Sequence, residues 1–184
     1  MNNYRINTNY AKALFMLAEE ADMERVADDM RRVGAVCAEN RELAVVFANP
    51  VIRPDKKSAV VRALFDGRVG DITMAFLLFV VKKNRSVNLR GICEAYLDLY
   101  RRHHGIVKTE LVTHQPVDDE ANRLIVEMVE HYTGKRVELH AATDAHMLGG
   151  FKLEFDHNMY DARLRTKLLK MRQEFAKNDY ESKL

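Results

Sequence analysis

The feature that most constrains the fold of this chain is a change in the spacing of its apolar residues near Gly105. Before that glycine, apolar side chains recur at the spacing of helices; after it, short runs rich in β-branched residues follow the spacing of strands. A chain that changes period in this way forms a helical part followed by a mixed part. The sequence therefore predicts an α+β protein, mostly α, with a six-helix bundle over residues 1–105 and a small α/β module over residues 106–184.

Prolines and glycines divide the first part into six predicted helices. Asn49 precedes Pro50, and a residue before proline is driven out of the helical region, whereas Pro54 suits a first helical turn. Gly105 is expected to end the sixth helix. The first predicted helix runs from Tyr4 or Thr8 to Ala21, and the second begins near Asp22. The third covers Glu42–Phe47, and the fourth begins at Pro54. The fifth covers Asp71–Lys83, with Asp71 as its cap, and the sixth covers Val87–His104.

The spacing of apolar residues in the second part predicts the element order strand, helix, strand, strand, helix. Gly149 and Gly150 indicate a turn or bulge, and Asp156–Asn158 indicates a second turn. The predicted strands are Ile106–Thr113, Arg136–Thr143 and Phe151–Phe155; a helix opens at Asp118–Asp119 with Ala121, Leu124, Ile125, Met128, Val129 and Tyr132 inward and closes at Gly134. A last helix is predicted from Asp161 to about Lys177, with Leu164, Leu168, Met171 and Phe175 in line and a frayed tail, NDYESKL, after it.

Composition is that of an ordinary soluble globular chain, with 184 residues, 30% of them charged, 47% hydrophobic and a net charge of +2. Residues 1–105 carry 17 basic and 13 acidic side chains, which is too few basic residues to predict nucleic acid as the main partner. The basic runs Lys82–Arg85 and Arg101–His104 fall at helix ends, where cations favour the helix dipole. The longest apolar run, Met74–Val81, is far shorter than the ~20 residues of a membrane span, so we expect no bilayer insertion.

Motifs for catalysis, cofactors and metals are not found in the sequence. No nucleophile elbow or phosphate-binding loop occurs. His140, His146 and His157 lack the spacing of a metal site, although sheet pairing of His140 with His157 would permit a weak one. Cys37 and Cys93 stand at apolar helical positions, which predicts buried free thiols in a reducing compartment. We therefore expect a non-catalytic protein without cofactor or metal.

Two predicted helices have more apolar surface than one bundle contact uses. A surface helix normally has one apolar stripe, but the first and fifth helices each have a second. If these spare sides face each other, they form a groove for an amphipathic helix; the alternative is that both helices are central and wholly buried. The candidate partner-binding residues are Tyr10, Ala13, Leu14 and Leu17 on the first helix and Ile72, Ala75, Phe76 and Phe79 on the fifth.

Several motifs, in order along almost the whole chain, resemble one protein family. They are YAKALFMLA from Tyr10, ANP at 48–50 with Lys56 and Lys57 downstream, FLLFVVKKNRSVNLRGI from Phe76, DAHMLGG from Asp144, and Tyr160-Asp161 before the helix with Leu164 and Leu168. Each motif is weak alone, but together they resemble the ATP synthase delta subunit family, which includes the mitochondrial oligomycin-sensitivity-conferring protein.

This resemblance implies a stator connector that links the catalytic head of a proton-translocating ATP synthase to its peripheral stalk. It implies that the first and fifth helices hold the N-terminal helix of an alpha subunit, and that the C-terminal module meets the b subunits. Because no transit or signal peptide opens the sequence, it also implies a peripheral position on the cytoplasmic face of a bacterial inner membrane. The alternative is an RNA-binding helical bundle of the antitermination-factor type, which a steep dependence of binding on salt would reveal.

The departures from the family pattern lie in the C-terminal part. Asp156-His157 stands where the family often has Gly-Asp, and Ala162-Arg163 stands where it often has Gly-Ser. Val112-Thr113-His114 replaces a pair of small residues after the first strand of the module. The contact with the b subunits is therefore the part of the resemblance that carries over least directly.

Overall fold

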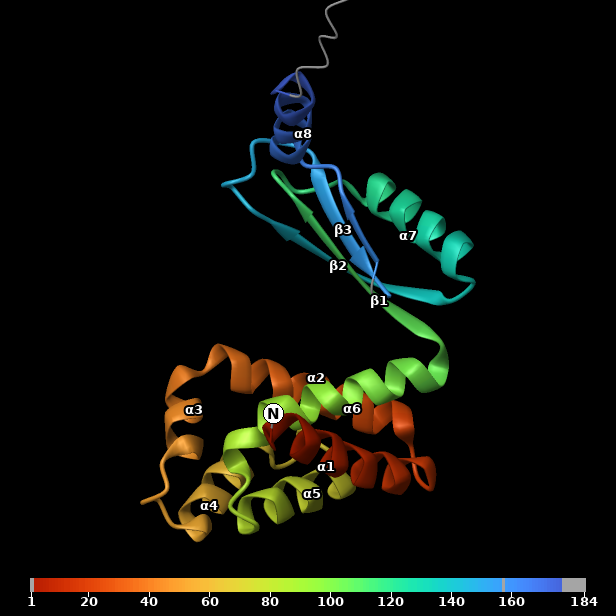
Figure 1. Cartoon of the computed structure of the whole chain (residues 1–184). Helices are drawn as coiled ribbons and strands as arrows, with labels where there is room; N and C mark the ends of the chain where they lie inside the picture. Colours follow the sequence, from red (N-terminus) through yellow and green to blue (C-terminus); the bar gives the residue numbers. More distant parts are fainter. Residues whose placement is uncertain (1, 157, 177–184) are drawn as a thin grey trace, which may run out of the picture. The chain divides into compact units, whose positions relative to one another are not determined.

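The computed structural model describes residues 2–156 and 158–176. The chain forms two compact units that divide between His104 and Gly105. The described part of the first unit is helical, and the second contains a four-stranded sheet and two helices (Figure 1). The protein is therefore α+β and mostly α, as the change of apolar period predicts.

The first unit consists of helices whose ends follow local sequence signals. Asp22 caps the second helix by accepting a hydrogen bond from the backbone N–H of Arg25, and Asn40 caps the third by accepting one from Leu43. Pro54 stands in the first turn of the fourth. The elements are α1 (Asn2–Glu19), α2 (Met23–Glu39), α3 (Arg41–Ala48), α4 (Pro54–Phe65), α5 (Asp71–Lys82), the short 3-10 helix η1 (Ser86–Asn88) and α6 (Leu89–His104).

The prediction of Asp71 as a helix cap is wrong. Gly70 is the cap residue of α5, and Asp71 is already inside the first turn. The reason is tertiary, because the N–H of Gly70 donates to the buried carboxylate of Asp29 on α2, at 2.8 Å. This bond holds the chain extended at Gly70, so that the helix begins one residue earlier than predicted.

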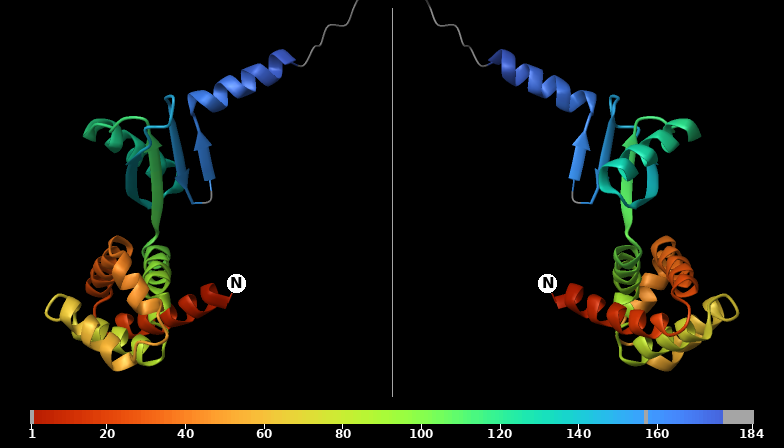
Figure 2. Two further views of the ribbon diagram at one scale, coloured as in Figure 1. Left: turned by 90° about the vertical axis from the view of Figure 1, so that its left-hand side faces the viewer. Right: turned by 90° about the vertical axis from the view of Figure 1, so that its right-hand side faces the viewer.

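Helix α6 is the centre of the first unit and packs against both α1 and α2 (Figures 1 and 2). Tyr96 of α6 and Met30 of α2 are fully buried there. The crossing of α1 over α6 is close at Gly91, where an added Cβ would lie 2.1 Å from the Nδ2 atom of Asn7. Glycine at position 91 therefore lets the N-terminal half of α1 lie directly on α6.

A buried lysine joins three elements of the first unit. The ammonium of Lys57 on α4 donates to the carbonyl oxygen of Phe47 at the end of α3, at 2.8 Å, and to Ser86 Oγ of η1, at 3.3 Å. Ser86 Oγ donates to the same carbonyl oxygen. Because helix C-termini attract cations, Lys57 stabilises the end of α3 although it is buried.

The second unit is a mixed sheet in the order β2-β1-β3-β4. Strand β1 pairs in parallel with β2 and antiparallel with β3, and β3 pairs antiparallel with β4. The parallel pair is connected through α7, which covers one face of the sheet (Figure 1). The elements are β1 (Ile106–Thr113), α7 (Asp119–Thr133), β2 (Arg136–Thr143), β3 (Phe151–Phe155), β4 (Asn158–Asp161) and α8 (Leu164–Ala176).

The core of the second unit lies between α7 and the sheet. Leu111 of β1, Leu153 of β3 and Val129 of α7 are its buried residues. The prediction that α7 is inward along its whole apolar side is wrong, because Leu124, Met128 and Tyr132 are exposed. One helix over four strands does not cover the sheet towards β4, and the side of α7 that faces this gap stays open to solvent.

The fourth strand was not predicted, since its four residues show no alternation. Asp156 has a positive φ of 40° and turns the chain, and residues from Asn158 then pair with β3, with Asp161 opposite Lys152. The last helix consequently begins at Leu164 rather than at Asp161. His157, Lys177 and the tail NDYESKL lie outside the described residues, so the predictions for them stay predictions.

Candidate functional site

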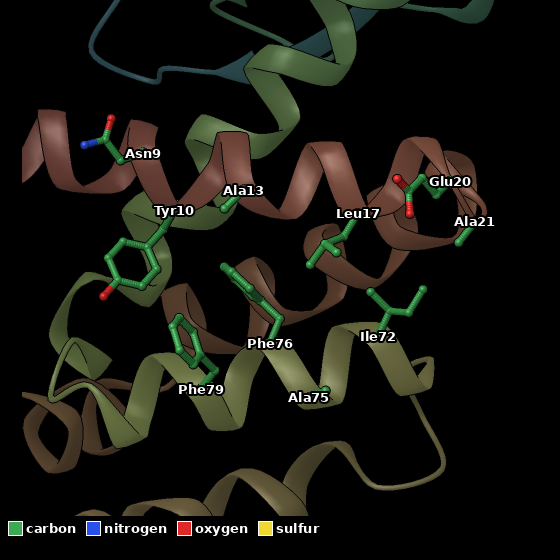
Figure 3. Close-up of a pocket in the computed structure, with 10 residues that line it drawn as sticks. All are labelled: Asn9, Tyr10, Ala13, Leu17, Glu20, Ala21, Ile72, Ala75, Phe76 and Phe79. Carbon is green, nitrogen blue, oxygen red and sulfur yellow. The ribbon is translucent and has the colours of Figure 1, made fainter.

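Helices α1 and α5 run antiparallel and leave an apolar groove between them. Tyr10 on α1 lies beside Phe79 near the end of α5, while Leu17 and Ala21 lie towards Ile72 at its start (Figure 3). The ring centroids of Tyr10 and Phe79 are 6.2 Å apart. The groove has a volume of about 880 Å³ and is lined by Asn9, Tyr10, Ala13, Leu17, Glu20, Ala21, Ile72, Ala75, Phe76 and Phe79.

The helical period explains why α1 contributes to both the core and the groove. Ala11, Leu14 and Ala18 form one stripe and are buried in the unit. Tyr10, Ala13 and Leu17 form the adjacent stripe, which lines the groove instead. Helix α5 is divided in the same way, with Leu77 and Val80 fully buried, whereas Ala75 and Phe79 face outwards. Each helix therefore satisfies the core with one side and presents a second apolar side.

The large side chains in the groove are accessible. Leu17 is 54% exposed and Phe79 is 48% exposed, and Tyr10 is half-buried. Phe76 is 7% exposed and forms the floor of the groove, where the groove meets the core. The alternative that both helices are wholly buried is therefore wrong.

Seven of the eight candidate residues line the groove, and Leu14 does not. Leu14 is fully buried among the bundle helices, so its inclusion in the contact side of α1 is wrong. Three lining residues were missed: Asn9, Glu20 and Ala21. They follow the same stripe, because Asn9 precedes Ala13 by four residues and Ala21 follows Leu17 by four. Helical spacing alone would have identified them, but the candidates were chosen for apolar character, and these side chains are small or polar.

A second apolar hollow lies in the other unit, between α7 and the β3–β4 hairpin. It has a volume of about 530 Å³ and is lined by Met128, Val129, Tyr132, Phe151, Leu153, Phe155, Asn158, Met159 and Tyr160. Beyond it, α8 exposes the apolar residues that the sequence places in line: Leu164, Leu168, Met171 and Phe175. These residues are spaced by four, three and four positions, which is the pattern of a coiled-coil seam.

The start of α8 is held by a compact network. The Asp161 carboxylate accepts hydrogen bonds from the backbone and guanidinium of Arg163 and from the Thr166 hydroxyl. The Arg163 guanidinium lowers the pKa of Asp161 well below its usual range. Gly150 has a φ of +84°, and an added Cβ would lie 2.2 Å from the carbonyl oxygen of Ala162. The exit of α8 from the sheet is thus defined by specific contacts.

Reactive groups do not gather at either apolar surface. Burial raises the pKa of the Cys93 thiol. It also raises the pKa of the Cys37 thiol, which is less completely buried, so both thiols stay protonated. Within the described part of the chain, no three His, Cys, Asp or Glu side chains come together as metal ligands. Among the described residues, none of the helices has both the length and the apolar character needed to cross a membrane.

Comparison with known proteins agrees with this architecture. Residues 6–175 match the family model described as ATP synthase delta (OSCP) subunit. The chain is 34% identical over 172 residues to the ATP synthase subunit delta of Salinibacter ruber, covering 91% of this chain and 89% of the relative. It is 33% identical over 177 residues to that of Cytophaga hutchinsonii, covering 96% and 97%.

A solved structure has the same fold. One chain of the cryo-EM structure of the Toxoplasma gondii mitochondrial ATP synthase hexamer superposes with a TM-score of 0.72, at 20% identity, over 92% of this chain and 97% of that chain. The family match spans both units, from α1 to α8. The chain therefore belongs to the ATP synthase delta (OSCP) subunit family and is a non-catalytic connector of the ATP synthase stator.

Proposed function

We propose that the α1–α5 groove binds the N-terminal helix of the ATP synthase alpha subunit, and that the second unit binds the b subunits of the peripheral stalk. The observation that carries the first contact is the exposure of Leu17 and Phe79, beside the half-buried Tyr10, around one apolar groove. An amphipathic helix recognises such a groove through apolar residues spaced by three and four positions.

The length of the groove suits a short helix. The lining residues extend from Asn9 on α1 to Ala21 in the turn after it, and the helical stretch from Asn9 to Leu17 alone covers about 12 Å at 1.5 Å per residue. A guest helix of about twelve residues, or roughly three turns, would span it. Such a helix is marginal alone in water, so it would become fully ordered on binding, when its apolar side is removed from water.

The proposed contact with the b subunits is supported by α8. Its apolar seam is exposed, and three of the four residues that flank the seam are basic, Arg165, Lys167 and Arg172, the fourth being Glu174. A long helix with its own apolar seam and acidic flanks matches this surface. With one partner on each unit, the chain would connect head to stalk through packing alone, on the cytoplasmic face of a bacterial inner membrane.

The groove proposal is tested with Phe79→Asp. A carboxylate at this position loses hydration when the guest covers it, and the substitution also removes the Phe79 ring from the apolar contact. In calorimetry with a synthetic peptide of the alpha-subunit N-terminus from the same organism, we expect no measurable binding to this variant. Phe79 is half-exposed, so the bundle should keep its circular dichroism spectrum.

The matched control is Met16→Asp. Met16 lies on the same helix α1 and is 66% exposed but does not line the groove. It should bind the peptide like the unaltered protein. Near-normal affinity of Phe79→Asp, or an equal loss in Met16→Asp, would contradict the groove as the binding site.

A further inference from the structure

The two ends of the α1–α5 groove carry opposite charge. At the end formed by Tyr10 and Phe79, the nearby residues in sequence are basic: Lys82, Lys83 and Arg85 follow Phe79, and residues 1–18 and 72–93 contain no aspartate or glutamate. The Lys83 ammonium lies 5.7 Å from the centre of the Phe79 ring. This places a positive charge directly at the edge of the apolar surface.

The opposite end, formed by Leu17 and Ile72, is acidic. Glu20 lines the groove itself. A smaller polar hollow of about 210 Å³ adjoins this end, sharing Ala21 and Ile72 with the groove, and Asp22, Asp29 and Asp71 line it together with Arg25. Arg25 offsets one of these negative charges, and Asp29 is already engaged with the N–H of Gly70. The net charge of this end is still negative.

We propose that this polarity fixes the orientation of the guest helix, an inference that rests on the proposed function of the groove. The guest would place acidic side chains beside Lys82 and Lys83 and basic side chains beside Glu20 and Asp71. Apolar packing contributes most of the affinity but hardly distinguishes the two orientations of the guest helix. Complementary charges at an interface fix the register and exclude the reversed orientation.

The same polarity determines the chain direction of the guest. A helix is stabilised by acidic residues in its first turn and basic residues in its last turn, because these charges oppose its own dipole. A short guest depends on that stabilisation, since its helix is marginal in isolation. It therefore lies with its N-terminus at the Tyr10–Phe79 end, parallel to α1 and antiparallel to α5.

Two designed peptides of equal composition test this orientation. Both have about twelve residues and the same apolar stripe; one carries Glu in the first turn and Lys in the last, and the other carries the reverse. We expect the unaltered protein to bind the first peptide about 3- to 10-fold more tightly, as two or three partly exposed ion pairs allow. The preference should fall towards one at molar salt, where such pairs are screened.

A charge-swapped protein supplies the decisive comparison. In the double variant Glu20→Lys, Lys83→Glu, the preference should disappear or invert. A nitroxide on the N-terminus of the first peptide should broaden the NMR signals of Phe79 in the unaltered protein and broaden them less in the double variant. The control double variant Glu127→Lys, Lys170→Glu makes the same exchange on exposed residues of the second unit and should keep the original preference.

The outcomes separate this inference from the proposed function. Equal affinity of the unaltered protein for both peptides, with both still abolished by Phe79→Asp, would overturn the orientation and leave the groove as the binding site. A nitroxide effect at Ile72 instead of Phe79 would overturn it as well. Failure of the designed peptides and of the alpha-subunit peptide to bind the unaltered protein would overturn both proposals.

Discussion

Tyr10 and Leu14 lie four residues apart on α1, yet only Tyr10 lines the groove. Four residues correspond to slightly more than one helical turn, so the two side chains point about 40° apart. That angle separates the core stripe from the groove stripe. Sequence spacing groups both residues on one apolar side, and only the position of α6 beneath α1 decides which of them is covered.

Tyr10 is expected to be an anchor of the groove. Its ring packs against Phe79, and an aromatic anchor in an interface typically contributes about 1–3 kcal/mol. Tyr10→Ala should therefore weaken binding of the alpha-subunit peptide by about 1–3 kcal/mol in calorimetry. Met16→Ala, on the exposed side of the same helix, serves as the control. An unchanged affinity for Tyr10→Ala would remove this residue from the contact.

Asp161 gives a prediction on pH. Its pKa is lowered in the folded chain by Arg163 and by hydrogen bonds from Arg163 and Thr166. The stabilisation is therefore fully present above the ordinary aspartate pKa of about 4 and is lost as the pH falls through the lowered value. Carboxyl carbon NMR should show that the pKa of Asp161 lies well below the ordinary aspartate value.

The matched variant for this titration is Arg163→Gln, which removes the cation and keeps a polar side chain of similar length. It should return the pKa of Asp161 towards its ordinary value. If Asp161 titrated at an ordinary aspartate pKa in the unaltered protein, the network at the start of α8 would not form as described.

At the scale of elements, α8 differs from the bundle helices in having no buried side. Each of its apolar seam residues is at least 44% exposed. In α6, by contrast, Ile92 and Tyr96 are fully buried by α1 and α2. An amphipathic helix that its own fold leaves uncovered is a candidate docking surface, and the network around Asp161 holds it in place beforehand.

Substitution of Leu168 tests this surface. Leu168→Asp puts a charge at the centre of the seam and should weaken binding of a purified soluble segment of the b subunits at least about tenfold, the scale of a lost interface anchor. Gln173→Asp adds the same charge on the polar side of α8 and should have little effect. Comparable losses in both variants, measured by sedimentation, would argue against the seam.

At the scale of the whole molecule, the chain consists of two compact units that join at Gly105. Gly105 has a φ of +62°, a conformation that glycine adopts without strain and that ends α6. Each unit contains its own core, and each has an accessible apolar surface: the α1–α5 groove on the first and the α8 seam on the second. The family assignment makes the chain a stator connector, and it favours this role over RNA binding, the alternative that the basic runs allow.

The separation of the units predicts that the first can be isolated. A fragment of residues 1–104 should fold, show a cooperative thermal transition by circular dichroism, and bind the alpha-subunit peptide within about twofold of the full chain. The fragment needs no residue of the second unit for its groove, since all lining residues lie on α1, α5 and the turn after α1. A large loss of affinity would mean that the second unit contributes to the site.

Much of the fold follows from local signals in the sequence. The bounds of β1, β2 and β3 agree with the predicted strands, because β-branched runs end at turn residues. Gly105 and Gly134 end helices in the left-handed conformation, as expected of glycine after a last helical turn. Strand β4 escaped prediction because four residues at a sheet edge show no period of their own.

The sequence by itself determined the period of each segment, the change of period at Gly105, the surplus apolar sides of α1 and α5, and the single apolar line of α8. It could do so because spacing, caps and turns act over a few neighbouring residues. Only the tertiary structure decided which surplus sides stay open. Leu14 of α1, the helix that packs against α6, is fully buried, whereas Phe79 of α5 is 48% exposed. Which side chain is covered depends on elements that are distant in the chain.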